Sequence, residues 1–162
     1  MPNEKAVINA SPFILLCKSG LAEILPELFA EIYIPEAVSD EILRGDDIAS
    51  QKLPDYLKNR LTPCQAEIAE DVLVWNLGSG ETEVLSFAFG NKTEFSALID
   101  DRAARKCAET LNIKTLGTGG ILVLAKRRGL IGNVSTELEK LRNAGLWISD
   151  EVRKAILKQA DE

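Results

Sequence analysis

The sequence predicts an α/β fold in which helices cover both faces of a small parallel sheet. Short apolar segments of strand length alternate with segments of helical periodicity along the chain. Short apolar strands separated by helices are typical of parallel sheets buried on both faces. The chain has 162 residues, of which 46% are hydrophobic, and this suits one domain with a sizeable core better than two. We therefore treat residues 1–162 as one domain, with C-terminal helices from about residue 134.

Four apolar segments are predicted as clear strands, and a fifth strand is expected in a less regular segment. The clear strands lie at residues 5–8, 31–34, 96–99 and 113–116. Pro35 closes the second of them, because proline cannot continue an interior strand. The fifth, a short strand, is expected within residues 57–63.

Helices are predicted between and after these strands. Ser11 is expected to cap the first helix, with Pro12 at its first position. The segment 44–56 is rich in turn residues and is predicted to be mobile. Further helices are expected at 36–43, 81–89, 102–111 and 121–129, then after a capping box at Thr136 and Glu139, and after a cap at Ser149.

The composition excludes several kinds of site. The chain has no histidine, which rules out Ser-His-Asp and Cys-His mechanisms and imidazole metal ligands. Three widely spaced cysteines, Cys17, Cys64 and Cys107, fit neither a disulfide framework nor structural zinc. No apolar run approaches membrane-spanning length and no signal peptide is visible. We therefore expect a cytoplasmic protein that does not associate with membranes.

The charge is unevenly distributed. The net charge is −6, yet the segment from Arg102 to Arg128 holds seven basic residues and one acid, Glu109. This basic sector carries +6 and the remainder of the chain carries −12. Such a distribution is compatible with a phosphate-bearing substrate. The alternative, which charge alone favours, is a set of solvated helix faces.

Helix periodicity separates two candidate acids from their neighbours. At about 100° per residue, Glu81 falls in the middle of the apolar stripe of its helix, and Glu83 faces solvent. In the helix at 36–43, Glu41 falls on the inward flank and Asp40 points outward. Burying a lone carboxylate is costly, so each inward acid must be paired, neutralised or bound to metal. For either acid alone, an internal salt bridge or a backbone cap is the simpler explanation.

Polar residues also follow two of the predicted strands. Asn9 ends the first strand, and Asp100 and Asp101 follow the strand at 96–99. Capping explains one aspartate, but two adjacent acids exceed what capping needs. Because sites in parallel α/β folds lie beyond the carboxyl ends of the strands, we expect Asn9, Glu41, Glu81 and Asp100 or Asp101 to converge. Oxygen ligands of this kind suit Mg²⁺ or Mn²⁺, which activates water and neutralises a phosphate.

Five motifs in order resemble the PIN-domain family, and the resemblance reaches to about Ser149. The family's fold is a three-layer α/β/α sandwich with a small parallel sheet, and its acidic cluster binds Mg²⁺ or Mn²⁺ and cleaves RNA. Many members are VapC-like toxins of toxin–antitoxin pairs. The match is closer to a little-characterised branch with asparagine in place of the first strand-end aspartate. The motifs are "VINASPFILLCKSGLAEIL", "IPEAVSDEIL", "LGSGETEVLSFA", "LIDDRAARKCAETLNI" and "GTGGILVLAKRRGLI".

The resemblance implies a role for each matching residue. The catalytic positions fall on Asn9, Glu41, Glu81 and Asp101, and the metal ligands on Asn9, Glu81 and Asp101, with Asp100 as the alternative to Asp101. Ser11 is the companion hydroxyl, on the substrate side of the site. The amide of Asn9 can still ligate a metal but brings no charge. A weakly active or inactive site is therefore the alternative to a nuclease.

The substrate-binding residues are expected next to these acids. Arg102 and Arg105 of the basic sector would bind the RNA backbone. Thr118 lies in "GTGG", which could contact a phosphate or simply form a tight turn. This stretch is not a Walker A loop, because no lysine follows its last glycine. A nucleotide-binding domain is therefore a weak third interpretation.

The function expected from these features is a Mg²⁺- or Mn²⁺-dependent ribonuclease, a VapC-like toxin with a small antitoxin as partner. The alternative is a PIN-like module that binds RNA or a partner protein with little or no catalysis. We also expect a homodimer, or a surface covered by the antitoxin, because one domain of this size leaves some apolar C-terminal residues unburied. These residues are Leu138, Leu141, Trp147, Ile148, Val152 and Ile156.

Overall fold

The computed structural model, which describes residues 4–91 and 93–162, is built on a five-stranded sheet whose neighbouring strands are all parallel. The strand order is β3-β2-β1-β4-β5, so β1 lies at the centre. Ala6, Val7 and Ile8 of this strand are fully buried. The strands are β1 (Lys5–Ile8), β2 (Glu31–Pro35), β3 (Thr62–Cys64), β4 (Phe95–Leu98) and β5 (Thr115–Leu116).

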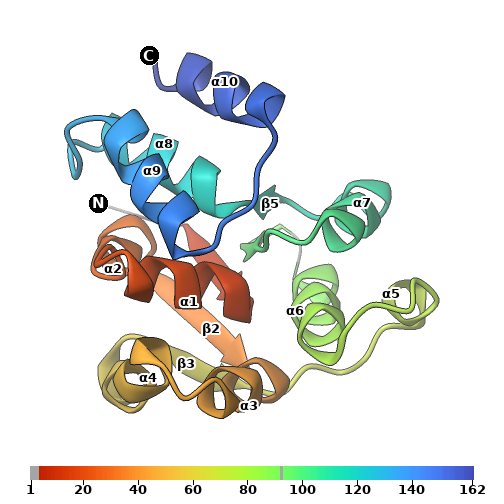
Figure 1. The fold of residues 1–162 in the computed structure, drawn as a ribbon. Helices are drawn as coiled ribbons and strands as arrows, with labels where there is room; N and C mark the ends of the chain where they lie inside the picture. The colour runs from red at the N-terminus through yellow and green to blue at the C-terminus, as the bar shows by residue number, and fades with distance from the viewer. Residues whose placement is uncertain (1–3, 92) are drawn as a thin grey trace.

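Helices cover both faces of this sheet, which gives the predicted α/β/α sandwich (Figure 1). On one face, α1 packs against α4, α8 and α9, and α2 packs against α8. On the other, α6 lies across β1, β2 and β4 and contacts α7. The helices are α1 (Ala10–Lys18), α2 (Ile24–Leu28), α3 (Glu36–Arg44), α4 (Ile48–Asn59), α5 (Glu70–Leu73), α6 (Ser79–Gly90), α7 (Arg102–Thr110), α8 (Thr118–Arg127), α9 (Val134–Ala144) and α10 (Asp150–Gln159).

The chain order places a topological switch point between β1 and β4. From β1 the chain continues through α1 and on to β2 and β3, while from β4 it continues through α7 to β5 in the opposite direction across the sheet. Parallel α/β sheets bind ligands outside the carboxyl ends of strands at such a point. Asn9 follows β1 and Asp100 follows β4, so both predicted strand-end groups lie at this switch point.

The prediction of a mobile segment at 44–56 is wrong, because most of it forms helix α4. Asp47 and Ser50 cap this helix reciprocally: the Ser50 amide donates to Asp47 Oδ1 at 3.1 Å, and the Asp47 amide donates to Ser50 Oγ at 2.9 Å. Leu53 and Tyr56 are buried on its inner face. Pro54 is tolerated within the helix.

Several predicted element boundaries also differ from the structure. Helix α1 begins at Ala10, with Asn9 rather than Ser11 in the N-cap position. Asn133 caps α9 by accepting from the Thr136 amide, so the capping box expected at Thr136 is not used. Helix α8 begins at Thr118, and "GTGG" is therefore its first turn rather than a separate loop. Ser149 caps α10 as predicted, by accepting from the Val152 amide at 3.2 Å.

The apolar residues of the C-terminal helices are only partly exposed. Leu138 and Leu141, which were expected to need a partner, are fully buried within the chain. Trp147 is 85% exposed and Val152 is 47% exposed. Helix α10 contacts α8, where a Cβ at Gly119 would lie 2.5 Å from Ile156 Cδ1. In the described residues no helix is both long and apolar enough to cross a membrane.

Candidate active site

Asn9 is fixed at the centre of the carboxyl edge of the sheet. Its backbone amide donates to the carbonyl of Leu98 at 3.0 Å, which extends the pairing of β1 with β4 by one residue. Its side chain is only 3% exposed. A buried amide must find hydrogen-bond partners, so this side chain has a defined orientation rather than a solvated one.

The partner of Asn9 is Glu81, in the first turn of α6. Asn9 Nδ2 donates to Glu81 Oε1 at 3.4 Å, a long bond. Two glycines allow this approach. A Cβ at Gly80 would lie 3.1 Å from Asn9 Oδ1, and a Cβ at Gly78 would lie 2.5 Å from Glu81 Oε2. Neither glycine has the positive φ that demands glycine, so room for these two side chains explains both.

Glu41 lies close enough to Glu81 for their charges to interact. The pKa of Glu41 is raised, first by partial burial of its carboxyl group and second by the negative charge of Glu81. Glu41 was predicted on the inward flank of its helix, but the residue is exposed. The periodicity argument placed it on the correct side for Glu81 and overstated its burial.

The neighbouring acids that were predicted to face solvent differ from each other. Asp40 is exposed, as predicted. Glu83 is half-buried, so the prediction for this residue is wrong. Burial raises the pKa of Glu83, while a hydrogen bond from the Ala37 amide in the first turn of α3 acts in the opposite direction. Glu83 thus packs between α6 and α3 because those two helices contact each other.

Asp100 is held by donors from two other elements. Its Oδ1 accepts from the Thr118 amide at 2.7 Å, and its Oδ2 accepts from Thr118 Oγ1 at 2.6 Å. Ser11 Oγ donates to Oδ2 at 3.4 Å. Asp100 therefore connects the end of β4 to the first turns of α1 and α8. Its carboxylate also faces the positive end of the α8 dipole.

Asp101, the next residue, has a different role. It is exposed and caps its own helix, because its Oδ2 accepts from the Ala104 amide at 2.9 Å. The carboxylate that faces Ser11 and Thr118 is that of Asp100. Capping thus accounts for Asp101, on which the resemblance placed the catalytic acid, and Asp100, the alternative, is the member of the pair that contacts Ser11 and Thr118.

The predicted substrate-binding residues fall into two classes. Arg102 and Arg105 are exposed on α7, and neither forms an ion pair with any residue in 4–91 or 93–162. Thr118 is fully buried, and both its amide and its hydroxyl donate to Asp100. The structure thus gives Thr118 a role in orienting Asp100, which sequence reasoning did not foresee.

A family model described as a PIN domain matches residues 5–162, almost the whole chain. The chain belongs to the PIN-domain family. No curated protein matches it closely enough to add a named relative. The PIN domain is a nuclease-type fold, and the polar residues at the switch point occupy the edge where an α/β fold of this kind places its chemistry.

PIN domains generally use divalent metal ions, so the donors of this chain were compared with what such an ion needs. Among the described residues, no group of three acidic, cysteine or histidine side chains lies close enough together to hold a metal by itself. The oxygens of Asn9, Glu81 and Asp100 are nevertheless the hard ligands that Mg²⁺ and Mn²⁺ prefer. Mg²⁺ commonly keeps several waters and binds through one or two carboxylates, and this donor set fits that mode.

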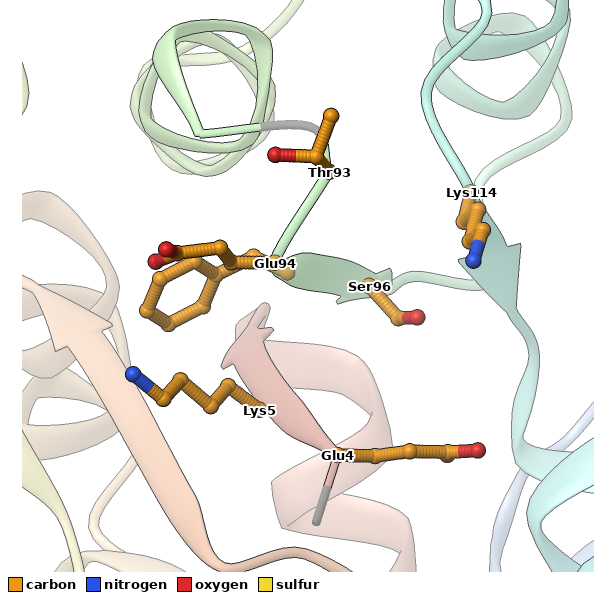
Figure 2. Close-up of a pocket in the computed structure, with 7 residues that line it drawn as sticks. Glu4, Lys5, Thr93, Glu94, Ser96 and Lys114 are labelled. Carbon is orange, nitrogen blue, oxygen red and sulfur yellow. The ribbon is translucent and has the colours of Figure 1, made fainter.

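Two clefts formed by the described residues of this PIN domain lie at the other edge of the sheet. One cleft of about 400 Å³ is lined by the amino ends of β1 and β4, and Figure 2 shows Lys5, Glu94 and Lys114 around it. An adjoining cleft of about 410 Å³ continues beside β5 and α8. The Lys5 amine pairs with Glu31 at 3.1 Å and lies 5.8 Å from the centre of the Phe95 ring. These contacts neutralise Lys5, and no carboxylate of the predicted site lines either cleft.

Proposed function

We propose that this PIN domain is a Mg²⁺- or Mn²⁺-dependent endoribonuclease, a VapC-like toxin acting in the cytoplasm. The observation that supports this most strongly is the pair of hydrogen-bonded groups at the switch point. Asn9 bonds to Glu81 on one side, and Ser11 and Thr118 bond to Asp100 on the other. Asn9 and Ser11, one from each group, are two residues apart at the start of α1. The backbone hydrogen bond from Asn9 to Leu98 also connects the strands that precede the two groups.

The metal would be held by Asn9 Oδ1, Glu81 and Asp100, and when bound it would supply an activated water and neutralise charge on the phosphate. We assign the ligand role to Asp100 in place of Asp101, because Asp101 is an exposed helix cap. Ser11 and Thr118 hold the Asp100 carboxylate in one orientation. They are positioning residues in this scheme.

Glu41 is the group best suited to take up a proton. Its raised pKa makes the carboxylate a stronger base than an ordinary glutamate, and its exposure leaves it accessible to water. Arg102 and Arg105 would bind the phosphates that flank the cleaved bond. The proton that leaves the attacking water would pass to Glu41, and the departing ribose oxygen would take a proton from solvent.

The test is cleavage of a labelled RNA with Mg²⁺ or Mn²⁺ and with chelator. The parent protein should cleave only with metal, and Glu81→Gln should lower the rate by at least about 100-fold. Glu83→Gln is the matched control, since Glu83 lies in the same helix and bonds to Ala37 instead of the site. Cleavage that persists in chelator, or that survives Glu81→Gln, would contradict the proposal.

A second function is favoured by one specific observation, the neutral Asn9 where the general family pattern has aspartate. Asn9 donates to Glu81 where an aspartate would repel it. The site therefore carries less negative charge and binds a cation less strongly. In this second proposal the chain binds RNA or a partner protein without cutting. RNA binding by the parent protein, together with no cleavage at any Mn²⁺ concentration, would favour it.

For the partner, we propose that a second copy of the chain or a small antitoxin covers Trp147 and Val152. These two residues, 85% and 47% exposed, lie just before and at the start of α10. Light scattering of the parent protein and of Trp147→Ser tests this. A complex that falls to monomer in the variant supports the proposal, and a parent protein that stays monomeric, alone and with a co-expressed antitoxin, contradicts it.

A further inference from the structure

Gly117, the residue before α8, is a glycine that its backbone does not require. Its φ of −80° and ψ of 171° are extended values that any residue adopts. It is buried, and a Cβ there would lie 2.5 Å from Arg105 Nη1 and 3.2 Å from Asp100 Oδ1. A side chain at position 117 would meet the guanidinium end of Arg105 and the Asp100 carboxylate. The glycine therefore leaves these two groups side by side.

Arg105 reaches this place from another element. It lies within α7, where its amide donates to the Asp101 carbonyl at 2.9 Å, and α7 contacts β5 next to Gly117 (Figure 1). Arg102, which begins the same helix, is exposed and lies beside none of the described glycines in this way. The two arginines of α7 thus differ in what lies next to them.

The Arg105 guanidinium does not neutralise Asp100 directly. Arg105 and Asp100 form no ion pair, and the Asp100 oxygens accept from Thr118 and Ser11 instead. One positive charge therefore lies close to a site carboxylate, and among the described residues its guanidinium forms no ion pair, so its donors remain available to an anion.

We propose that Gly117 lets Arg105 lie beside Asp100 so that its guanidinium receives a phosphate of the RNA next to the metal. The proposal rests on the proposed function and assigns a specific cation to it. It predicts that removing the Arg105 charge changes the affinity for RNA and the affinity for the metal in opposite directions. The same charge that attracts the phosphate repels a divalent cation at Asp100, so removing it weakens RNA binding and tightens metal binding.

The first experiment compares Arg105→Gln with Arg102→Gln, which removes the same charge from the same helix. Binding of a labelled single-stranded RNA is followed by anisotropy in chelator, so that no cleavage occurs, and Mn²⁺ binding is followed by calorimetry without RNA. Arg105→Gln should weaken RNA binding about tenfold and tighten Mn²⁺ binding about threefold. Arg102→Gln removes a cation that is farther from Asp100, so it should weaken RNA binding clearly less, by about threefold, and leave Mn²⁺ binding unchanged.

The second experiment is a double-mutant cycle with Gly117→Ala, which displaces Arg105 but keeps its charge. The alanine should weaken RNA binding in the parent protein and have a smaller effect in the Arg105→Gln background, because the atom that its Cβ meets most closely is Arg105 Nη1. Melting curves of all variants show whether each one is folded. Arg105→Lys, a milder change, should recover part of the affinity through charge alone.

Three outcomes would overturn the proposal: equal losses of RNA affinity for the two arginine variants, an equal effect of Gly117→Ala in both backgrounds, or weaker Mn²⁺ binding in Arg105→Gln. A parent protein that binds Mn²⁺ but no RNA would overturn it as well. None of these readouts depends on cleavage. If the parent protein fails to cleave RNA but Arg105→Gln binds RNA more weakly and Mn²⁺ more tightly, the result refutes the proposed nuclease activity and supports the proposed role of Arg105.

Discussion

Two groups of polar side chains share the carboxyl edge of this PIN domain, and their hydrogen bonding differs. In the Asp100 group, formed by Asp100, Ser11 and Thr118, the carboxylate accepts three hydrogen bonds, two of them at 2.7 Å or less. In the Glu81 group, formed by Glu81, Asn9 and Glu41, one hydrogen bond joins the side chains in the described residues, the 3.4 Å bond from Asn9 to Glu81. Glu41 adds a second negative charge to that group.

The difference indicates which group a cation would stabilise most. The Asp100 group is complete without a metal, since backbone and hydroxyl donors already balance its charge. The Glu81 group has two acids and one neutral amide, and its negative charge is only partly offset, by Arg44 acting on Glu41. We infer that Asp100 contributes mainly a fixed position and that Glu81 contributes most of the attraction for a cation.

The largest expected effect on stability concerns Asp100. Asp100→Ala leaves the Thr118 amide and hydroxyl buried without their acceptor and removes an anion from the start of α8. The free energy of unfolding should fall by about 2–4 kcal/mol. Asp101→Ala removes a single exposed cap and should cost about 1 kcal/mol. Urea denaturation of both variants measures the two losses, and equal losses would contradict the difference between the adjacent acids.

The next effect concerns the charge of the Glu81 group. Asn9→Asp places a third acid beside Glu81 and Glu41 at nearly constant volume, and it replaces an attractive contact by a repulsive one. Stability without metal should fall by about 1 kcal/mol, and Mn²⁺ should bind more tightly because the interaction of one added charge is worth a few kcal/mol before desolvation. Nuclease activity should equal or exceed that of the parent.

Melting curves with and without Mn²⁺ distinguish this expectation from a purely structural role for Asn9. If the amide serves only to hold the start of α1, the substitution lowers stability equally in both conditions and leaves Mn²⁺ affinity unchanged. That result would also remove the argument that the Glu81 group attracts the cation.

The smallest effect is a pH dependence that arises from Glu41. Its pKa in the folded protein is raised above the ordinary value of 4.5 by burial and by Glu81, so the folded state holds this proton where the unfolded state has released it. Stability should therefore decline as the pH rises from about 4.5 through the raised pKa. Glu41→Gln should remove this decline and be more stable than the parent at neutral pH by less than about 0.5 kcal/mol. Denaturation at several pH values between 4 and 8 checks the sign, and a parallel pH dependence in both proteins would refute it.

Much of the fold follows from local signals in the sequence. The alternation of apolar strands and helices predicted the parallel sheet, and the central strand at 5–8 matches β1 to the residue. The missed helix α4 shows the limit of those signals. A turn-like composition argued against a helix, while the Asp47–Ser50 capping box and the burial of Leu53 and Tyr56 favoured it. Tertiary packing outweighed local propensity there.

The candidate site was predictable in outline only. Periodicity and strand ends predicted that Asn9, Glu41 and Glu81 lie near one another, and the structure brings these three together. Sequence spacing could not distinguish Asp100 from Asp101, because adjacent residues share every local signal and differ only in which neighbour they meet. The sequence also could not predict why glycine stands at positions 78, 80 and 117. At each position a Cβ would meet side chains that only the folded structure brings there.

The central claim is that the Asp100 and Glu81 groups together form one divalent metal site. Calorimetric titration with Mn²⁺ of the parent, Glu81→Gln, Asp100→Asn and Asp101→Asn tests it most directly. The account predicts one Mn²⁺ per chain, a loss of affinity of about tenfold or more for Glu81→Gln, a smaller loss for Asp100→Asn, and parent-like binding for Asp101→Asn. A parent protein that binds no Mn²⁺, or an Asp101→Asn variant that loses as much affinity as Asp100→Asn, would contradict it.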